Sequence, residues 1–450
     1  MTEDGLLSGM FSRGPVVAEV GDRAVLQAML DVEAALARAL AGAGLATDEA
    51  AAEIASAADA SGFDLAAIGR SAGDTGMPVV GMLEQLRARL GSEGAAYLHR
   101  GATSQDVVDT ALMLVTKRAI APLLDELARA ADACADLAER HRTALAPGRT
   151  LLQQALPVTF GLKAAGWLTG LDGARRELTD VRRGVLAVQL GGAVGTLAAL
   201  GDRGLEVGAG VAAELGLDDP PVPWHTQRLR PARLACALGA AVGVMGKIGR
   251  DVTLLAQTEV AEATEGGEAR GASSAMPHKR NPVSAIAIAA CAQRTPGLVA
   301  TILGAMVQEH ERAAGAWQAE WEPLLELLRL AGSAAATLAD LLAGLKVDAE
   351  RMRSNLGATG ELLMSESVAT ALTDSLGRTE AQRLVTEATR ATAGGRSTFR
   401  DALLALPEVR ERLGASGVTV ALDPSRYLGV CEELISRAVA AHHQGRRGRA

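Results

Sequence analysis

Apolar residues recur at helical spacing over a long stretch of this 450-residue chain, and this pattern constrains the fold more than any other feature. From Leu234 to Leu255 the apolar side chains follow one another three or four residues apart, and Pro231 precedes them at a first-turn position. The predicted helix is much longer than the average helix of a globular protein. Its apolar face cannot be buried in one thin bundle, so we expect such helices to pack in a larger assembly.

The composition agrees with a helical fold. Hydrophobic residues make up 48% of the chain, but aromatic residues only 2%. Ala, Leu, Val and Gly therefore supply the apolar content, which favours helices that pack closely through small side chains. No sustained alternation of period two is present, which predicts few strands.

Two further stretches predict long helices. One begins at Val108 and continues through Pro122, which should kink or divide it. The other covers about residues 282–345. A shorter helix is expected from Asp22, a candidate N-cap, to Gly42.

These patterns predict an all-α chain with a central bundle of very long helices. We expect three domains from the length of the chain and the position of the long helices. Their expected bounds are residues 1–106 for an N-terminal helical domain, 107–345 for the central bundle and 346–450 for a C-terminal helical domain.

Charge and cysteine spacing exclude several classes of protein. The formal net charge of −8 argues against a nucleic-acid-binding surface. The four cysteines show no zinc-binding spacing, so we expect reduced thiols and a cytoplasmic location. The opening residues include Glu3 and Asp4 and no apolar run follows, so we expect no secretory signal and no membrane partner.

A glycine-rich run, Gly191–Thr196, does not indicate nucleotide binding. It lacks the Gly-Lys-Ser/Thr ending of a phosphate-binding loop and the strand that a dinucleotide fold needs. A tight turn in the core is the better interpretation. Since the sequence contains no metal-binding cluster and no nucleotide motif, we expect no cofactor.

The densest set of reactive side chains lies in residues 271–283, which read GASSAMPHKRNPV. Pro277 and Pro282 exclude a helix interior, so the segment is predicted to be a loop. Lys279 and Asn281 stand two residues apart and would face one pocket in an extended chain. Such a loop can hold an anionic substrate while a serine moves a proton. An ordinary polar surface loop is the alternative.

Four more segments carry polar side chains that suit a carboxylate substrate. They are residues 97–106 (YLHRGATSQD), 148–163, 223–228 (PWHTQR) and 308–312 (QEHER), the last followed by Trp317, Glu320 and Trp321. Ser104 would cap the helix that follows it, and helix N-termini also bind carboxylates. Arg149 has the fork shape that binds a carboxylate, although a solvated surface arginine is the plainer explanation.

The loop resembles the signature loop of the fumarase/aspartase superfamily, in a long match without gaps. Residues 223–228 and 308–312 are similar to the corresponding segments of bacterial 3-carboxy-cis,cis-muconate cycloisomerases within that superfamily. The resemblance covers nearly the whole chain, from Phe11 to Gly429. It implies an all-α three-domain fold whose long helices form a multi-helix core in a homotetramer, with active sites shared between subunits.

The resemblance also implies roles for individual residues. Ser273 matches the catalytic serine that gives or takes a proton, while Lys279 and Asn281 would hold the extra charge of an aci-carboxylate intermediate. The implied substrate-binding residues are His99, Thr103, Ser104, Arg149, Thr150, Gln153, His225, Gln227, Arg228, Ser274, Met276, His310 and Arg312. The expected partner is a small polycarboxylate.

One position departs from the superfamily pattern. Fumarases and adenylosuccinate lyases read Gly-Arg-Thr-His where this chain reads Gly-Arg-Thr-Leu and ends on Leu151; the cycloisomerases also lack the histidine and often carry tryptophan there. Leucine cannot act as a general acid, and amine or hydroxide leaving groups need one. A carboxylate is a weak base that departs unaided, so the sequence favours a cycloisomerase.

The expected reaction interconverts 3-carboxy-cis,cis-muconate and 4-carboxymuconolactone, a step of aromatic catabolism. Any weakly basic leaving group fits the same argument, so a lyase that expels nitrite from nitrosuccinate to give fumarate is the alternative. Adenylosuccinate lyase ranks third because it needs the absent histidine. A catalytically silent helical assembly would belong to another class of protein, and the intact Ser273, Lys279 and Asn281 argue against it.

Overall fold

The computed structural model describes residues 6–266, 271, 276, 278–393, 395 and 397–447. Within these residues the chain is predominantly helical, with a few short strands. It forms two compact units, each assembled from three stretches of sequence. The first holds residues 1–129, 173–249 and 284–340, and the second holds 130–172, 250–283 and 341–450. The domain bounds predicted at residues 106 and 345 are based on helix length, whereas these units are defined by contacts, so the predicted bounds stay a prediction.

Short helices surround α2 (Asp22–Gly42) in the first unit. They are α1 (Val16–Glu19), α3 (Asp48–Ala57), α4 (Leu65–Thr75), α5 (Val79–Arg87), α6 (Ser92–Tyr97) and α9 (Gly204–Leu215). Gly21 precedes α2 in extended conformation, so Asp22 is the first residue of the helix rather than its predicted N-cap. The helix ends at Gly42, as its sequence predicts.

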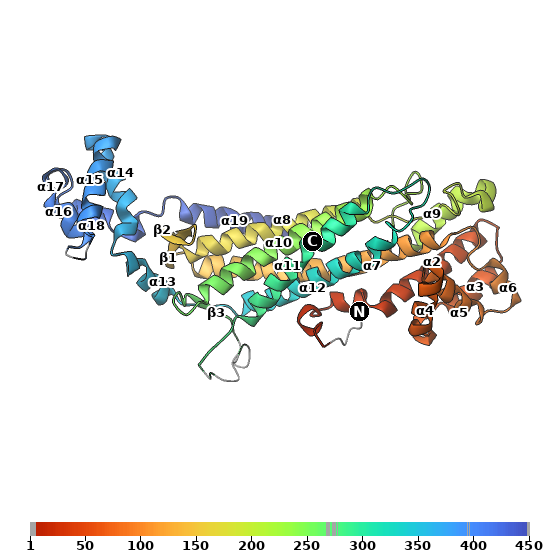
Figure 1. Cartoon of the computed structure of the whole chain (residues 1–450). Coiled ribbons are helices and arrows are strands. Elements are labelled where there is room, and N and C mark those ends of the chain that lie inside the picture. The colour runs from red at the N-terminus through yellow and green to blue at the C-terminus, as the bar shows by residue number, and fades with distance from the viewer. Residues whose placement is uncertain are drawn as a thin grey trace. The chain divides into compact units, whose positions relative to one another are not determined.

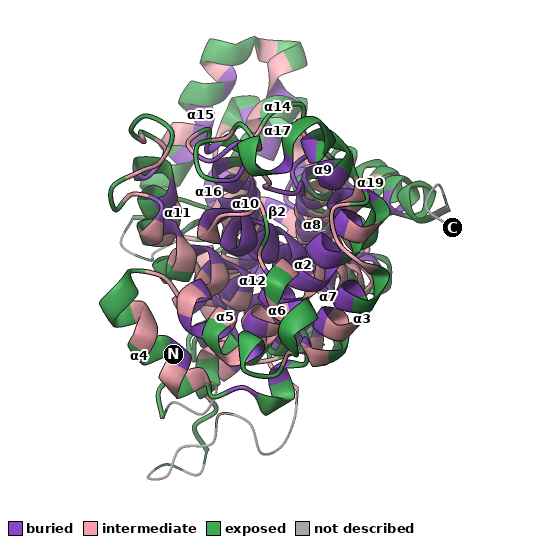
Figure 2. Ribbon diagram, turned by 90° about the vertical axis from the view of Figure 1, so that its right-hand side faces the viewer, coloured by how far each residue is buried: buried purple, intermediate pink, exposed green. Residues whose placement is uncertain are grey.

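Long helices form the rest of the first unit and continue into the second. They are α7 (Ser104–Arg140), α8 (Phe160–Gly184), α10 (Leu229–Leu255), α11 (Val283–Gly304) and α12 (Trp321–Ala343). In the first unit they lie side by side (Figure 1), and their packed sides carry most of its buried residues (Figure 2). This mostly helical fold with very long helices is the one that the sequence predicts.

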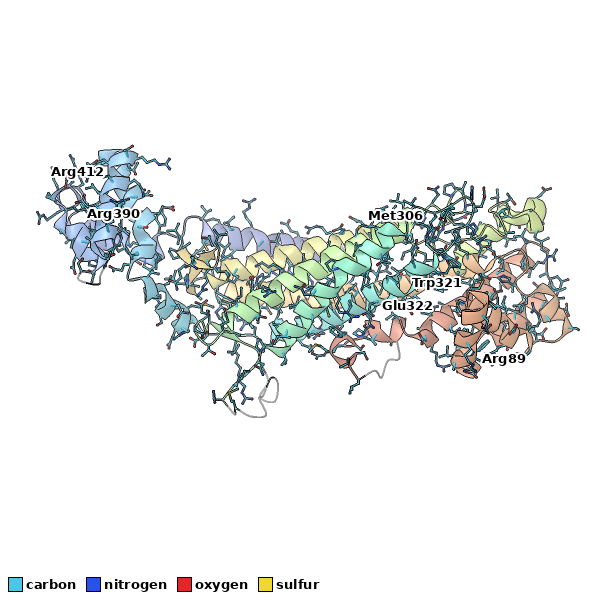
Figure 3. All side chains as sticks on the ribbon, in the orientation of Figure 1. Arg89, Met306, Trp321, Glu322, Arg390 and Arg412 are labelled. Carbon is cyan, nitrogen blue, oxygen red and sulfur yellow. The ribbon has the colours of Figure 1, made fainter. Side chains whose placement is uncertain are left out.

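One prediction about these helices is wrong, and one of the two outcomes predicted for Pro122 is excluded. Residues 282–345 do not form one stretch, because a connection with Gly315 in left-handed conformation (φ 109°) separates α11 from α12, between Met306 and Trp321 in Figure 3. Pro122 does not divide α7, which is continuous over 37 residues. Its neighbours Ile120 and Leu123 are fully buried, so tertiary packing holds the helical path despite the proline.

The second unit contains the strands and the C-terminal helices. Strands β1 (Leu145–Thr150) and β2 (Gln153–Thr159) form an antiparallel hairpin, and β3 (Ala263–Thr264) pairs with β4 (Lys346–Val347). The helices are α13 (Ala349–Leu356), α14 (Ser365–Leu376), α15 (Arg378–Ala391), α16 (Phe399–Ala405), α17 (Pro407–Arg412), α18 (Gly414–Ala421) and α19 (Cys431–Arg447). Helices α14 to α18 enclose an apolar core of their own around Leu384 and Phe399, while Arg390 and Arg412 are exposed on this group (Figure 3).

Short 3₁₀ turns connect several of these elements. They lie at Gly9–Phe11, Ala60–Gly62, Ala198–Arg203, Gln318–Glu320, Gly357–Thr359, Leu362–Met364 and Pro424–Arg426. The run Gly191–Thr196 forms a turn, as its sequence predicts, but only Gly191 and Gly192 are in the core, because Ala193, Val194 and Thr196 are exposed.

Two helices are long and apolar enough to cross a membrane by length and composition. In their most apolar windows, 56% of the residues of α10 and 28% of those of α11 are buried within the fold. Helix α11 leaves Ile286 and Leu303 more than two-fifths exposed. An apolar helix face that is open to water favours contact with another surface.

Candidate functional site

Two of the predicted substrate-binding residues, Thr103 and Ser104, lie where α7 begins; Ser104 is the first residue of the helix. Thr103 precedes the helix, and its backbone N–H donates to Oδ2 of Asp106 at 3.0 Å. An acidic residue that reaches back from the third helical position in this way is half of a capping box. Asp106 is buried, so the start of α7 is fixed from inside the fold.

The same carboxylate also fixes the glycine turn. The backbone N–H groups of Gly191 and Gly192 donate to Asp106 at 3.0 and 2.9 Å. A Cβ on Gly191 would lie 2.7 Å from Cε1 of His225, so only glycine fits at this position. His225 is buried, with Nε2 2.7 Å from Oδ1 of Asp106. Asp106 thereby joins three of the segments found in the sequence.

Arg228 lies at the centre of a buried ion network. Its guanidinium donates to both carboxylate oxygens of Asp109 at 2.8 and 3.0 Å and to Glu320 at 2.6 Å. Trp317 donates its indole N–H to Asp109 at 3.0 Å. The side chains of Arg228, Asp109 and Glu320 are at most 2% exposed. Residues 223–228 and 317–320 are thus held together by charge inside the first unit.

Burial and charge oppose each other in this network. Burial alone would lower the pKa of Arg228, but the charges and hydrogen bonds of Asp109 and Glu320 outweigh it and raise that pKa. Burial raises the pKa of Glu320, while Arg228 lowers it in part. The buried charge of Arg228 is balanced by Asp109 and Glu320. Removing one of these partners would leave an unpaired buried charge.

Arg312 connects the network to the glycine turn. It donates to Oε1 of Gln105 at 3.0 Å and to the carbonyl oxygen of Ala193 at 2.8 Å. Gln105 in turn donates to the carbonyl oxygen of His225 at 2.8 Å. His310 is exposed with φ 48°, and its carbonyl oxygen accepts from the hydroxyl of Thr226. Gln227 is exposed.

His99 contacts a carboxylate from another helix. Its Nδ1 lies 2.6 Å from Oε1 of Glu33 on α2, whose side chain is fully buried. Burial opposes the charged imidazolium, but the hydrogen bond and charge of Glu33, with the charge of Asp106, outweigh it and raise the pKa of His99. These interactions therefore favour the imidazolium form of His99 more than in a free histidine.

In the second unit, Arg149 is held by a buried carboxylate. Its guanidinium donates to Oε2 and Oε1 of Glu262 at 2.9 and 2.5 Å, and Asn355 donates to Oε1 at 2.7 Å. The side chain of Glu262 is fully buried and that of Arg149 is 24% exposed. Arg149 thus has a bidentate partner within the chain.

The tip of the β1–β2 hairpin combines an unfavourable backbone conformation with exposed apolar side chains. Leu151 and Leu152 form the turn with φ of 51° and 65°, the conformation of a type I′ turn, which strongly prefers Asn and Gly. Their exposed fractions are 97% and 73%. Thr150 and Gln153, which pair across the turn, are exposed as well. The position where the sequence lacks a histidine is thus an exposed, strained, apolar tip.

The signature loop is closed at its base by Gly271 and Asn281. The backbone N–H and the side-chain amide of Asn281 both donate to the carbonyl oxygen of Gly271, at 2.9 and 3.2 Å. A Cβ on Gly271, where φ is 72°, would lie 2.1 Å from the carbonyl oxygen of Asn281, so glycine is required. Met276 and Lys279 are exposed. Ser273 and Ser274 lie outside the described residues.

The structure thus joins part of the predicted set. Thr103, His225, Arg228 and Arg312 form one connected network, and Ser104 follows Thr103 as the first residue of α7. Arg149 and the loop residues belong to the other unit. Gln105, Asp106 and Trp317 belong to the segments found in the sequence but were given no individual role, whereas Glu33, Asp109, Gln189 and Glu262 lie outside those segments. The Thr-Ser-Gln-Asp spacing of a capping box is the signal that would have found Asp106.

Among the described residues, no group of three or more His, Cys, Asp or Glu side chains is arranged to hold a metal ion. The acidic side chains of the network are instead paired with Arg228 and His225. The chemistry of this region is therefore that of fixed charges and hydrogen-bond donors.

Comparison with known proteins identifies the family. Residues 12–297 match the family described as "Lyase", and residues 361–438 match that described as "Adenylosuccinate lyase C-terminus". A 3-carboxy-cis,cis-muconate cycloisomerase of Bradyrhizobium diazoefficiens is 46% identical over 96% of this chain and 97% of its own length. A nitrosuccinate lyase of Streptomyces davaonensis is 45% identical over 98% of this chain and 95% of its own length.

A solved structure agrees with these matches. The 3-carboxy-cis,cis-muconate lactonizing enzyme from Pseudomonas putida has a TM-score of 0.92 and 39% identity, over 98% of this chain and 99% of that one. The chain therefore belongs to the fumarase/aspartase superfamily of lyases. More particularly, it is an enzyme homologous to the cycloisomerases of that superfamily. Of the two apolar helices, α10 is mostly buried within the fold, while α11 keeps an exposed apolar face.

Proposed function

We propose that the chain is a cytoplasmic 3-carboxy-cis,cis-muconate cycloisomerase of aromatic catabolism. Its similarity to cycloisomerases over nearly the whole length supports this assignment. The observation that carries the proposal is the hairpin tip, where Leu151 stands in place of an ionisable side chain and is 97% exposed. A site without an acid at this position suits a carboxylate leaving group.

The proposed reaction needs no co-reactant. One substrate carboxylate adds to a carbon of the double bond, and a C–O bond forms while the π electrons move to the carbon beside another carboxylate. The resulting aci-carboxylate is stabilised by Lys279 and Asn281. Ser273 then delivers a proton to that carbon, and the reverse reaction removes it. A serine can do this only in a site that excludes water and stabilises the alkoxide.

The buried network supplies the other half of the proposed site. The start of α7 presents free backbone N–H groups, which bind carboxylates. We assign contact with the substrate to Thr103, Ser104 and Arg312. His225 and Arg228, whose polar atoms are bound to Asp106, Asp109 and Glu320, hold these residues in place.

A nitrosuccinate lyase is the second candidate, and its similarity to this chain supports it. The identity to the Streptomyces enzyme is 45%, close to the 46% found for the cycloisomerase. Nitrite is also a weak base, so the hairpin tip suits both reactions. Sequence similarity alone does not rank them.

Two assays on one purified protein separate these functions. Loss of conjugated-diene absorbance with 3-carboxy-cis,cis-muconate supports the cycloisomerase, and release of fumarate from nitrosuccinate supports the lyase. Ser273→Ala should lower kcat at least about a thousandfold with either substrate, because no other group replaces the proton donor. A variant that keeps its full rate would disprove the role of Ser273.

We also propose a homotetramer whose active sites are shared between subunits. Mixing two inactive variants, Ser273→Ala and Arg312→Ala, tests this directly. If the loop and the α7 network of one site come from different copies, some hybrid sites contain neither substitution and activity returns after subunit exchange. Mixtures that stay inactive although the subunits exchange would contradict shared sites.

A further inference from the structure

Glu33 occupies a position that an apolar residue should hold. On α2 it lies on the same helical face as Leu26, Leu30, Ala37 and Leu40, all of which are buried. Its side chain is fully buried. A carboxylate in such a place costs stability unless it is paired and hydrogen-bonded.

His99 is the partner that Glu33 has within the described part of the chain. Oε1 of Glu33 lies 2.6 Å from Nδ1 of His99, whose side chain is 18% exposed. Oε2 is buried and has no hydrogen-bond partner among the described residues. Since only one oxygen is satisfied, the carboxylate is poorly explained as a structural element alone.

The backbone of His99 is also held in an unfavourable conformation. Its φ is 60°, in the left-handed region. This conformation is unfavourable for a residue with a Cβ atom. Helix α2 holds the ring of this residue through Glu33, and the residue lies only four positions before Thr103. Such strain is typical of functional sites.

Charged groups on three helices change the pKa of the His99 imidazole. Glu33 on α2 and Asp106 on α7 raise the pKa of His99, while burial and Arg87 on α5 lower it. The two carboxylates prevail, so the imidazolium form is favoured. A cation beside the amino end of α7 adds to the attraction that this end exerts on a carboxylate.

We propose that Glu33 is a positioning residue that keeps His99 a cation, so that Nε2–H donates to a carboxylate of the substrate at the start of α7. The inference rests on the proposed function for its substrate class, a small polycarboxylate. Glu33 contacts no substrate itself. It fixes the tautomer and the charge of a residue that does.

The test measures binding rather than turnover. Tricarballylate, a stable tricarboxylate, is titrated into the protein in a calorimeter between pH 5.5 and 8.5. Glu33→Gln should weaken binding about tenfold at pH 7.5, because the uncharged amide no longer favours the imidazolium. Near pH 5.5 the variant should bind like the wild-type protein, since His99 is protonated without help. The pH at which affinity falls should therefore move down.

A matched control exists in the same unit. Glu53 on α3 also accepts hydrogen bonds, from the backbone N–H groups of Gly91 and Gly94, but it meets no histidine within the described part of the chain. Glu53→Gln should leave tricarballylate affinity and its pH dependence unchanged. If Glu33→Gln fails to fold, His99→Gln replaces it and should weaken binding at low pH as well.

The outcomes separate this inference from the proposed function. If the protein turns over no carboxymuconate but tricarballylate binding depends on Glu33 as described, the function is wrong and the positioning role stands. If turnover is present but Glu33→Gln binds like the wild-type protein at pH 7.5, the positioning role is wrong. A wild-type protein that does not bind tricarballylate at pH 5.5 would also overturn it.

Discussion

The buried network around Arg228 and the tip of the β1–β2 hairpin hold their side chains in opposite ways. In the network, each of Arg228, Asp109 and Glu320 is at most 2% exposed and bonded to another of the three. At the tip, Leu151 and Leu152 are 97% and 73% exposed and adopt a turn that leucine disfavours. In the network every buried charge is paired. At the tip, two apolar side chains are exposed and their backbone adopts a conformation that leucine disfavours.

This difference indicates that the two regions have different roles. The network is complete within the first unit, so its charges primarily position the start of α7. The two leucines at the tip are exposed, so packing within their own unit does not explain why they are apolar. Local violations of this kind are expected where function, not stability, selects the residue. We therefore assign the fixed charges to the scaffold and the acid-free chemistry to the tip.

The largest expected effect comes from breaking the network. Arg228→Met should lower the free energy of unfolding by about 3–5 kcal/mol, because Asp109 and Glu320 are left buried without their partner. Thermal unfolding measures the loss. Arg38→Met is the control: its pair with Glu214 is exposed, so the melting temperature should stay close to that of the wild-type protein. Equal effects of the two substitutions would contradict the account of the network.

The hairpin tip should respond in the opposite sense. Leu151→Asn combined with Leu152→Gly supplies the residues that a type I′ turn prefers and should stabilise the protein, by up to about 1–2 kcal/mol. Turnover should nevertheless fall about tenfold or more, because the apolar surface is lost from the site. Unfolding and kcat/KM are measured on the same preparation. Unchanged kcat/KM would show that the tip is only a turn.

The smallest effect concerns Glu33 and depends on pH. Since the pKa of His99 is raised in the folded state, the stabilising interaction is complete below about pH 6.5, the ordinary value, and is lost as the pH rises through the folded-state value. Glu33→Gln should therefore cost about 1 kcal/mol at pH 6 and less at pH 9. Denaturant unfolding at the two pH values checks the sign. A cost that grows with pH would contradict the ion pair.

Much of the fold follows from the sequence, because apolar periodicity fixes helices such as α2 and α10. The division between α11 and α12 was missed, since a polar connection inside an apolar stretch gives a weak periodic signal. Pro122 does not divide α7, because packing of the nearby buried residues outweighs the local preference of proline, while the predicted kink stays a prediction.

The site was predictable where a motif carries it. The segments around Thr103, His225 and Arg312 were selected by their strings of polar residues, and the structure connects them. Asp109 and Glu262 were not selected, because a single acid within a helix or beside a strand has no distinctive spacing. Which partner such an acid meets depends on tertiary contacts that sequence spacing does not encode.

The central claim is that this site processes polycarboxylates whose leaving group needs no acid. Rates measured with 3-carboxy-cis,cis-muconate, nitrosuccinate and adenylosuccinate on one preparation test it most directly. We expect efficient turnover of one of the first two and at least about a thousandfold lower kcat/KM for adenylosuccinate, whose amine leaving group is strongly basic. Comparable turnover of adenylosuccinate would contradict it.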